Sequence, residues 1–151
     1  MTRPASSDTA CVCGRLRRAA RALTQLYDDA MAPSGLRLTQ FSLMRTIARR
    51  EPVRITELAG LALLDRTALS RNLEPLAAEG YVRITPGKDA RTREVALTAA
   101  GRAAHERALP YWREAQRAVA RKLGTQRTGA LVNLLADVEA LHPDSGPLRE
   151  G

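Results

Sequence analysis

The chain has 151 residues, of which 44% are hydrophobic and only 3% aromatic, so we expect one domain with a core of leucine, alanine and valine that needs neither disulfides nor metal. Its 24 Lys and Arg residues outnumber 16 Asp and Glu residues, and the formal charge of +8 points to partners that carry phosphate. The absence of an apolar stretch of about 18 residues and of a signal-like segment predicts a cytoplasmic protein that does not use a membrane.

A first helix is predicted from about residue 9 to residue 32, after a polar segment, residues 1–8, that we expect to be disordered. Apolar residues recur every three or four positions along it and would form one face. This face consists of Leu16, Ala19, Ala20, Leu23, Leu26, Tyr27 and Ala30. A second helix is predicted to start at the cap residue Thr39 and to stop before Pro52.

Residues 53–97 have the pattern of a winged helix-turn-helix. A short helix capped by Thr56 is followed within a few residues by a second helix, for which Asp65 is a good N-cap. The second helix has an apolar stripe at intervals of four and three residues, formed by Leu69, Leu73 and Leu76. This spacing predicts that one side of the second helix packs on a core.

The other side of this second helix carries side chains that form hydrogen bonds. They are Arg66, Thr67, Ser70 and Arg71. Arginine can bind guanine through two hydrogen bonds, hydroxyls can reach phosphates or base edges, and no bulky apolar group blocks the approach to a major groove. Taken alone, the pattern fits a DNA-recognition helix and an ordinary amphipathic helix equally well, and the flanking sequence favours the former.

Two segments after this helix, residues 81–85 and 93–97, alternate polar and apolar residues and predict an antiparallel hairpin. The loop between them is basic and turn-forming, and Arg91 is the residue expected to reach a minor groove or a phosphate. Asp89 is expected to hold the guanidinium of Arg91 in a fixed orientation through a charge-assisted pair. The DNA-binding candidates in this hairpin are Lys88, Asp89, Arg91 and Arg93. The alternative is a surface hairpin with scattered charges.

Residues 98–141 predict two more helices. Thr98 caps the first, and Gly124 separates it from a last helix over residues 125–141, while residues 142–151 are expected to be disordered. The last helix is expected to bury Leu131, Leu134, Leu135, Val138 and Leu141. Since the terminal helices lie outside the small winged core, their apolar faces predict a two-fold dimer with recognition helices about 34 Å apart.

Residues from about 10 to 141 resemble the MarR (multiple antibiotic resistance regulator) family of transcription factors. The motifs that carry the resemblance are Leu64–Leu73 in the recognition helix, Glu79–Val82 at its end, Asp89–Arg91 in the wing, and Val95–Gly101 where the wing joins the next helix. The expected fold is therefore mainly α-helical with a small β-hairpin wing: a winged helix-turn-helix flanked by N- and C-terminal dimerisation helices.

The resemblance also implies a function. Members of this family are homodimers that bind a pseudo-palindromic operator in double-stranded DNA and are usually released by a small molecule or by oxidation. An effector pocket between the dimerisation helices and the winged part is implied, with Tyr27, Met31, His105 and Trp112 as candidates. The expected function is thus a transcriptional repressor of a nearby operon.

Few residues suggest chemistry beyond binding. Cys11 and Cys13 lie near the start of the first helix, where the helix dipole and nearby arginines favour a thiolate, so they are either redox sensors or ordinary reduced cysteines. His105 and His142 have no neighbours of the kind that ligate metal. We therefore predict neither a metal site nor a cofactor, and no enzyme activity, since a thiol enzyme would rest on the two cysteines alone.

One competing function belongs to another class, because a winged helix can also bind protein without any operator specificity. The exposed residues of the predicted recognition helix are cationic and hydrogen-bonding, and they include no aromatic anchor of the kind that protein interfaces use. This composition favours DNA.

Overall fold

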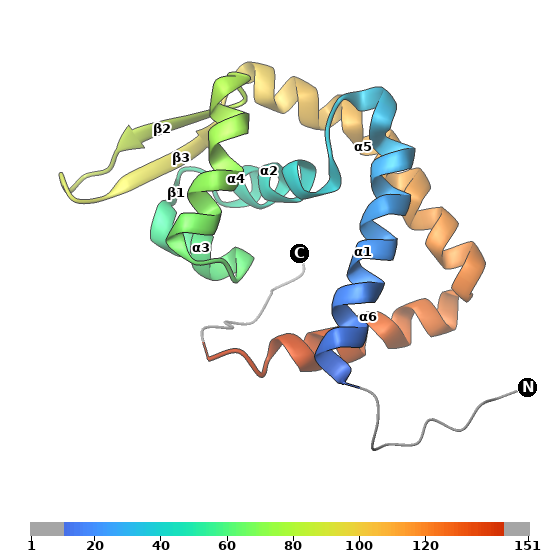
Figure 1. The fold of residues 1–151 in the computed structure, drawn as a ribbon. Coiled ribbons are helices and arrows are strands. Elements are labelled where there is room, and N and C mark those ends of the chain that lie inside the picture. The colour runs from blue at the N-terminus through green and yellow to red at the C-terminus, as the bar shows by residue number, and fades with distance from the viewer. Residues whose placement is uncertain (1–10, 144–151) are drawn as a thin grey trace, which may run out of the picture.

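Two groups of elements make up the computed structural model, which describes residues 11–143 (Figure 1). The predictions for residues 1–8 and 144–151 lie outside the described residues. In chain order the elements are α1 (Val12–Met31), the short 3-10 helix η1 (Ala32–Ser34), α2 (Leu38–Arg50), β1 (Val53–Arg54), α3 (Ile55–Ala62), α4 (Arg66–Ala78), β2 (Val82–Pro86), β3 (Arg93–Leu97), α5 (Ala99–Leu123) and α6 (Thr125–Glu139). Elements α2 to β3 form the winged part. Helices α1, α5 and α6 form the helical part, and α5 leads from the winged part to α6.

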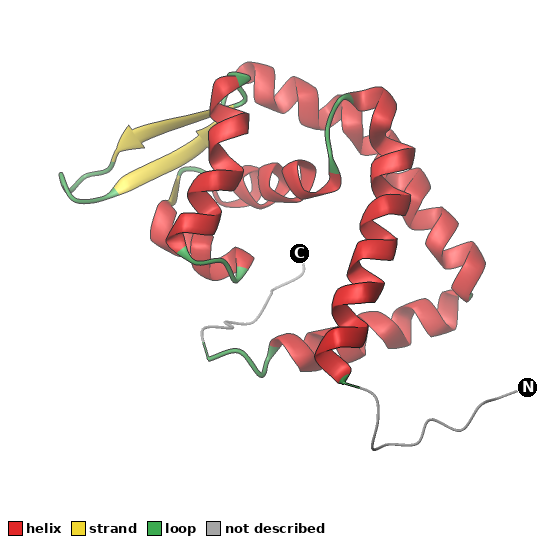
Figure 2. Ribbon diagram, viewed as in Figure 1, coloured by secondary structure: helices red, strands yellow, loops and turns green. Residues whose placement is uncertain are grey.

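The predicted hairpin is confirmed, but it is part of a sheet of three strands rather than two. The strand order is β1-β3-β2, all antiparallel, with Val53 opposite Val95 and Val82 opposite Leu97. Strand β1 has only two residues, too few to show the alternation by which strands are recognised in a sequence. Beyond β1, strands β2 and β3 continue as a hairpin that projects away from the helices (Figure 2).

The core of the chain lies in the winged part and where α5 meets it. The predicted stripe of α4 is fully inside it, since Leu69, Leu73 and Leu76 are all buried. The largest wholly buried side chains are Phe41, Met31, Met44, Ile47, Leu58, Leu69, Leu76, Val53 and Val95. They come from helices and from the sheet, so the recognition helix is fixed by packing on both.

Two predicted helix caps are confirmed. The Asp65 carboxylate accepts a hydrogen bond from the Ala68 backbone N–H at 2.8 Å, and the Thr98 hydroxyl accepts one from Gly101 N–H at 3.0 Å. Each satisfies an amide of the first turn that has no partner within its own helix. The starts of α4 and α5 were therefore readable from local sequence.

Two other predicted caps are wrong. Thr39 lies inside α2, which starts at Leu38, because the Asp28 carboxylate of α1 accepts the Leu38 N–H at 2.8 Å. Thr56 lies inside α3, which starts at Ile55, because β1 runs directly into the helix. Both starts are set by contacts between distant segments or by strand pairing, which cap preferences do not describe.

The start of α5 is packed tightly against the start of β2. The Thr98 N–H donates to the Tyr81 carbonyl at 3.0 Å, and the Thr98 hydroxyl donates to the Gly80 carbonyl. A Cβ atom on Gly101 would lie 2.9 Å from the carbonyl carbon of Tyr81 and still nearer its oxygen. Only a residue without a side chain fits there.

Glu51, at the end of α2, ties this junction to a third element. Its carboxylate accepts the Leu97 N–H at 2.7 Å and forms an ion pair with Arg102 of α5. Its side chain is only 13% exposed, so the pair is partly shielded from water. The end of α2, the end of β3 and the start of α5 are thus held at one point.

Helix α6 differs from the other long helices because none of its residues is buried in the single chain. The prediction that it buries Leu131, Leu134, Leu135 and Val138 is therefore wrong for one chain, and Leu134 is 61% exposed. Leu141, also predicted to be buried, lies beyond the end of α6 and is exposed. These positions are apolar, but the described part of the chain covers them only in part or not at all.

Within residues 11–143, no helix combines the length and the apolar character that crossing a membrane requires.

Candidate nucleic-acid interface

The predicted DNA-binding residues of helix α4 are exposed to solvent. Arg66, Thr67, Ser70 and Arg71 are all exposed, whereas the leucine stripe on the opposite side is buried. The helix is therefore oriented by its apolar side, and its hydrogen-bonding side is free to enter a groove. Its N-terminal turn carries Arg66 and Thr67, and recognition helices use this end to contact bases.

The turn between α3 and α4 is short and includes a strained residue. Leu63 has φ 50° and ψ 41°, in the left-handed region that costs a non-glycine residue about 1–2 kcal/mol. The turn is held by backbone hydrogen bonds, among them Leu64 N–H to the Ala59 carbonyl at 2.9 Å. A leucine does not predict this conformation, since glycine or asparagine is the residue usually found there.

The tip of the hairpin is ordered by Asp89, but not in the way that was predicted. Its carboxylate accepts the backbone N–H of Arg91 at 3.2 Å, and its carbonyl accepts the N–H and the hydroxyl of Thr92, both at 2.9 Å. No ion pair joins Asp89 to the Arg91 guanidinium. Asp89 therefore shapes the turn, as an aspartate does when it caps the backbone two residues on, and leaves the guanidinium free.

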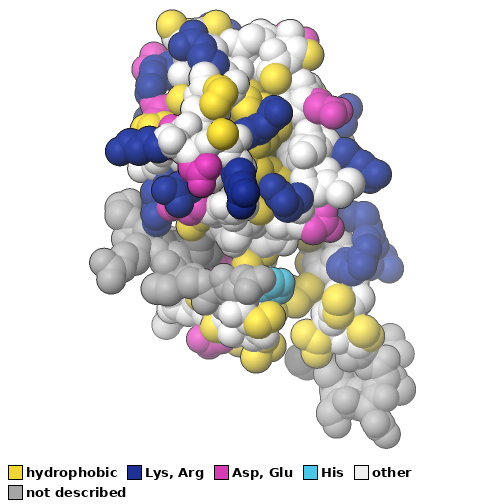
Figure 3. All heavy atoms as spheres, turned by 90° about the vertical axis from the view of Figure 1, so that its left-hand side faces the viewer, with side chains coloured by type: hydrophobic (Ala, Val, Ile, Leu, Met, Phe, Trp, Pro, Cys, Tyr) yellow, Lys and Arg dark blue, Asp and Glu magenta, His cyan; other side chains and the backbone are white. Residues whose placement is uncertain are grey.

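The cationic residues of the hairpin are exposed and lie near the recognition helix. Lys88, Arg91 and Arg93 all face solvent. Figure 3 shows many Lys and Arg side chains on the face of the molecule that carries the wing, with some Asp and Glu side chains among them. A surface of this kind attracts polyanions over a distance set by the ionic strength.

Two of the predicted effector residues meet at one aromatic ring. His105 of α5 stacks on Phe41 of α2, with ring centroids 4.6 Å apart, and Trp112 contacts the same Phe41 at 5.5 Å. Arg45 lies over the Trp112 ring at 4.3 Å. Phe41, which was not predicted as a site residue, is therefore the centre of this cluster between α2 and α5.

Burial and the charge of Arg45 lower the pKa of His105, against a smaller opposite effect of Glu106. The imidazole is therefore neutral at pH 7. Its Nε2 atom is buried and has no hydrogen-bond partner among the described residues.

The other two effector candidates have different surroundings. Met31 is wholly buried in the core. The Tyr27 hydroxyl donates to the Gln116 side chain of α5, and burial raises the pKa of Tyr27. Met31 belongs to the same hydrophobic cluster as Phe41, and Trp112 packs against that cluster.

The two cysteines lie at the start of α1, as predicted. Cys11 is the N-cap residue, and its Sγ atom accepts the Gly14 N–H at 3.4 Å, while Cys13 lies in the first turn. Both thiols are free and exposed. An oxidant in solution therefore has access to both.

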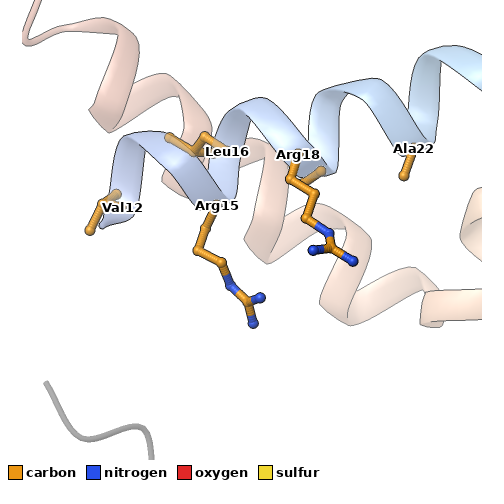
Figure 4. A pocket seen from close by; sticks show the side chains of 6 residues that line it. Val12, Arg15, Leu16, Arg18 and Ala22 are labelled. Carbon is orange, nitrogen blue, oxygen red and sulfur yellow. The ribbon is translucent and has the colours of Figure 1, made fainter. Parts of the chain in front are cut away.

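An open hollow runs along the flank of the same helix. Among residues 11–143 it is lined only by α1, and its volume is about 540 Å³. Its lining combines apolar side chains with Arg15 and Arg18, which extend to the same side (Figure 4). Its lining is formed by Val12, Arg15, Leu16, Arg18, Ala19 and Ala22. The hollow on α1 and the exposed apolar side of α6 are thus two apolar surfaces of the helical part that the described residues do not cover.

Comparison with known proteins gives consistent results. The model of the MarR family matches residues 36–92, from the loop before α2 to the tip of the wing. An uncharacterized HTH-type transcriptional regulator of Bacillus cereus is 34% identical over 96 residues, and this match spans 64% of each chain.

Among solved structures, the M. tuberculosis transcriptional regulator MosR in complex with DNA is 41% identical, with a TM-score of 0.75 over 88% of this chain and 99% of that one. A mutant of E. coli MarR in complex with operator DNA is 26% identical, with a TM-score of 0.74 over 83% of this chain and 91% of that one.

Proposed function

The chain belongs to the MarR family of transcriptional regulators, and on that premise we propose that it binds operator DNA as a homodimer and represses transcription of a nearby operon. The observation that carries the proposal is the orientation of α4. Its leucine stripe is buried and its four hydrogen-bonding residues are exposed beside a cationic wing. The alternative, a module that binds protein only, has no support from an exposed aromatic anchor on the described part of this face.

The surface of the helical part supports the proposal of a homodimer. The exposed apolar residues of α6 and the hollow on α1 are surfaces that a second copy of the chain would cover. A two-fold axis through this region would present two recognition helices to successive major grooves, about 34 Å apart.

Release from DNA is proposed to involve the junction of the two parts. A small molecule bound near His105 and Trp112 would contact α2 and α5 at once, and the unpartnered Nε2 atom offers it a hydrogen bond. Such a ligand shifts the equilibrium between a DNA-binding and a released conformation only as far as it binds one arrangement of these helices more tightly than the other.

Replacement of Arg66 or Arg71 by Ala tests the reading role of α4. We expect at least one of these variants to lose about 1–3 kcal/mol of operator binding and to relax base preference at one position, because a base contact carries sequence information. Arg91→Ala should instead weaken binding to all sequences and reduce the salt dependence by about one phosphate contact. Asp89→Ala should have a smaller effect of the same kind, since it loosens the turn that presents Arg91.

The measurement is a titration of the best duplex from a random pool, and of a scrambled duplex, at several salt concentrations. Arg107→Ala, an exposed arginine of α5, is the matched control for the loss of one charge. Wild-type affinity and selectivity in both Arg66→Ala and Arg71→Ala would refute the reading role.

Treatment with hydrogen peroxide tests the cysteines. Peroxide takes two electrons from two thiols, which become a disulfide, and is itself reduced to two water molecules. We expect peroxide to weaken DNA binding and dithiothreitol to restore it, while the Cys11→Ser, Cys13→Ser double variant stays insensitive. A double variant that responds like the wild type would make both residues bystanders, and a non-reducing gel would tell whether the bond joins two chains.

A further inference from the structure

A small cleft lies where the wing, the recognition helix and the end of β1 meet. Its volume is about 120 Å³, and it is lined by side chains from three separate segments. Arg54 comes from the β1–α3 junction with Thr56 after it, Arg66 from the first turn of α4, and Arg91 and Arg93 from the wing. Arg66, Arg91 and Arg93 are among the predicted DNA contacts, whereas Arg54 is not.

The positive charge in this cleft is not neutralised by the protein. None of the four arginines forms an ion pair within residues 11–143, and the cleft lining includes no carboxylate. Two acidic residues that adjoin these arginines in the chain or in the sheet do not pair with them. Asp65 caps α4, and Glu94, opposite Arg54 in the sheet, makes no ion pair with it. Four like charges around one hollow repel one another, and an anion placed among them relieves the repulsion.

The size of the cleft decides what kind of anion fits. A volume of about 120 Å³ corresponds to roughly four water molecules, which suits one tetrahedral oxyanion. It is well below the range of about 300–1,000 Å³ that is usual for pockets that hold small organic molecules. Guanidinium groups bind phosphate oxygens in pairs, so four of them can saturate a single phosphate group.

We propose that this cleft binds one phosphate group of the DNA backbone, and that Arg54 is therefore a DNA-contacting residue although it belongs neither to α4 nor to the wing. The proposal rests on the DNA-binding function proposed above. A backbone phosphate is favoured over a free anion because the lining includes the first residue of the reading helix and the tip residue of the wing, which DNA would approach together. One phosphate would then set the position of the wing relative to the reading helix.

Arg54→Ala in the full-length protein is the test, with Arg54→Lys and Arg107→Ala beside it. The wild type is first used to select its tightest duplex from a random pool. We expect Arg54→Ala to bind that duplex about tenfold more weakly, as for loss of a hydrogen bond to a charged group, and to lower the slope of log affinity against log salt by about 0.9. Arg54→Lys should restore the slope but not all of the affinity, and Arg107→Ala should change neither.

A scan of single methylphosphonate substitutions in the duplex identifies the phosphate itself. One position in each half-site should weaken the wild type more than it weakens Arg54→Ala, because the variant has already lost one of the four contacts to that phosphate. Thermal melting of the variant should match the wild type, since Arg54 is exposed and unpaired. Inorganic phosphate exchanged for chloride at constant ionic strength should inhibit the two proteins equally.

The outcomes separate this inference from the function on which it rests. A wild type that selects no duplex overturns the proposed function and the phosphate site with it. A wild type that binds DNA, with an unchanged salt slope and methylphosphonate profile in Arg54→Ala, overturns the phosphate site alone. Selective inhibition of the wild type by inorganic phosphate would assign the cleft to a free anion and would also overturn the inference.

Discussion

Gly101→Ala is expected to destabilise the chain by about 3 kcal/mol or more, although it adds a single methyl group to a helix. The new Cβ atom would overlap the carbonyl group of Tyr81, and neither backbone can move without loss of the hydrogen bond from Thr98 N–H to that carbonyl. Typical domains are stable by only about 5–15 kcal/mol, so a large share of the stability is at risk. The measurement is the midpoint of urea unfolding at fixed protein concentration.

Gly60→Ala is the matched control for this change. Gly60 lies inside α3, and a Cβ atom there would meet nothing within 4 Å. Alanine should therefore stabilise α3 by roughly 0.5–1 kcal/mol, the usual difference between the two residues in a helix. Equal midpoints of urea unfolding for the wild type and Gly101→Ala would contradict this prediction, because they would show that the β2–α5 junction accommodates the methyl group without loss of stability.

Leu134→Glu, alone or together with Leu135→Glu, is expected to separate the dimer into monomers. Leu134 is 61% exposed in one chain, so a charge there costs little in the monomer but would be buried against the second subunit. Loss of the second reading helix should weaken operator binding on the order of 100-fold, since the two half-sites would no longer be bound together.

Sedimentation and DNA titration at micromolar protein concentration measure the two effects. Asn133→Glu is the control, because Asn133 is an exposed residue on the opposite side of α6 and receives the same charge. A wild type that sediments as a stable monomer, or a Leu134→Glu variant that remains dimeric, would refute the assignment of this face.

The parts of the molecule that depend on local pattern were predictable from the sequence. The leucine spacing of α4, its cap Asp65 and the pairing of β2 with β3 each involve residues that are near in the chain, and each is confirmed. The exposed face of α4 is predictable for the same reason, because it is the side of the helix opposite the buried leucine stripe.

The parts that depend on contacts between distant segments were not predictable. Strand β1 is recognisable only by its pairing with β3, and the start of α2 by its contact with α1. The place of Arg54 in the cleft requires three segments to be brought together, which no spacing in the sequence indicates. Asp89 was assigned to the right loop but to the wrong partner, because a carboxylate two residues before an arginine can serve either its backbone or its side chain.

The hydrogen bond from the Leu38 N–H to Asp28 makes the two parts of the molecule energetically dependent on each other. Any event that pulls α1 away from α2 leaves the first amide of α2 without its acceptor, at a cost of about 1 kcal/mol, or roughly a fivefold change in the ratio of two conformations. Such a coupling acts in both directions by thermodynamic necessity. An event at α1 that changes the affinity of the winged part for DNA would therefore have its own equilibrium constant changed by the same factor when DNA is bound.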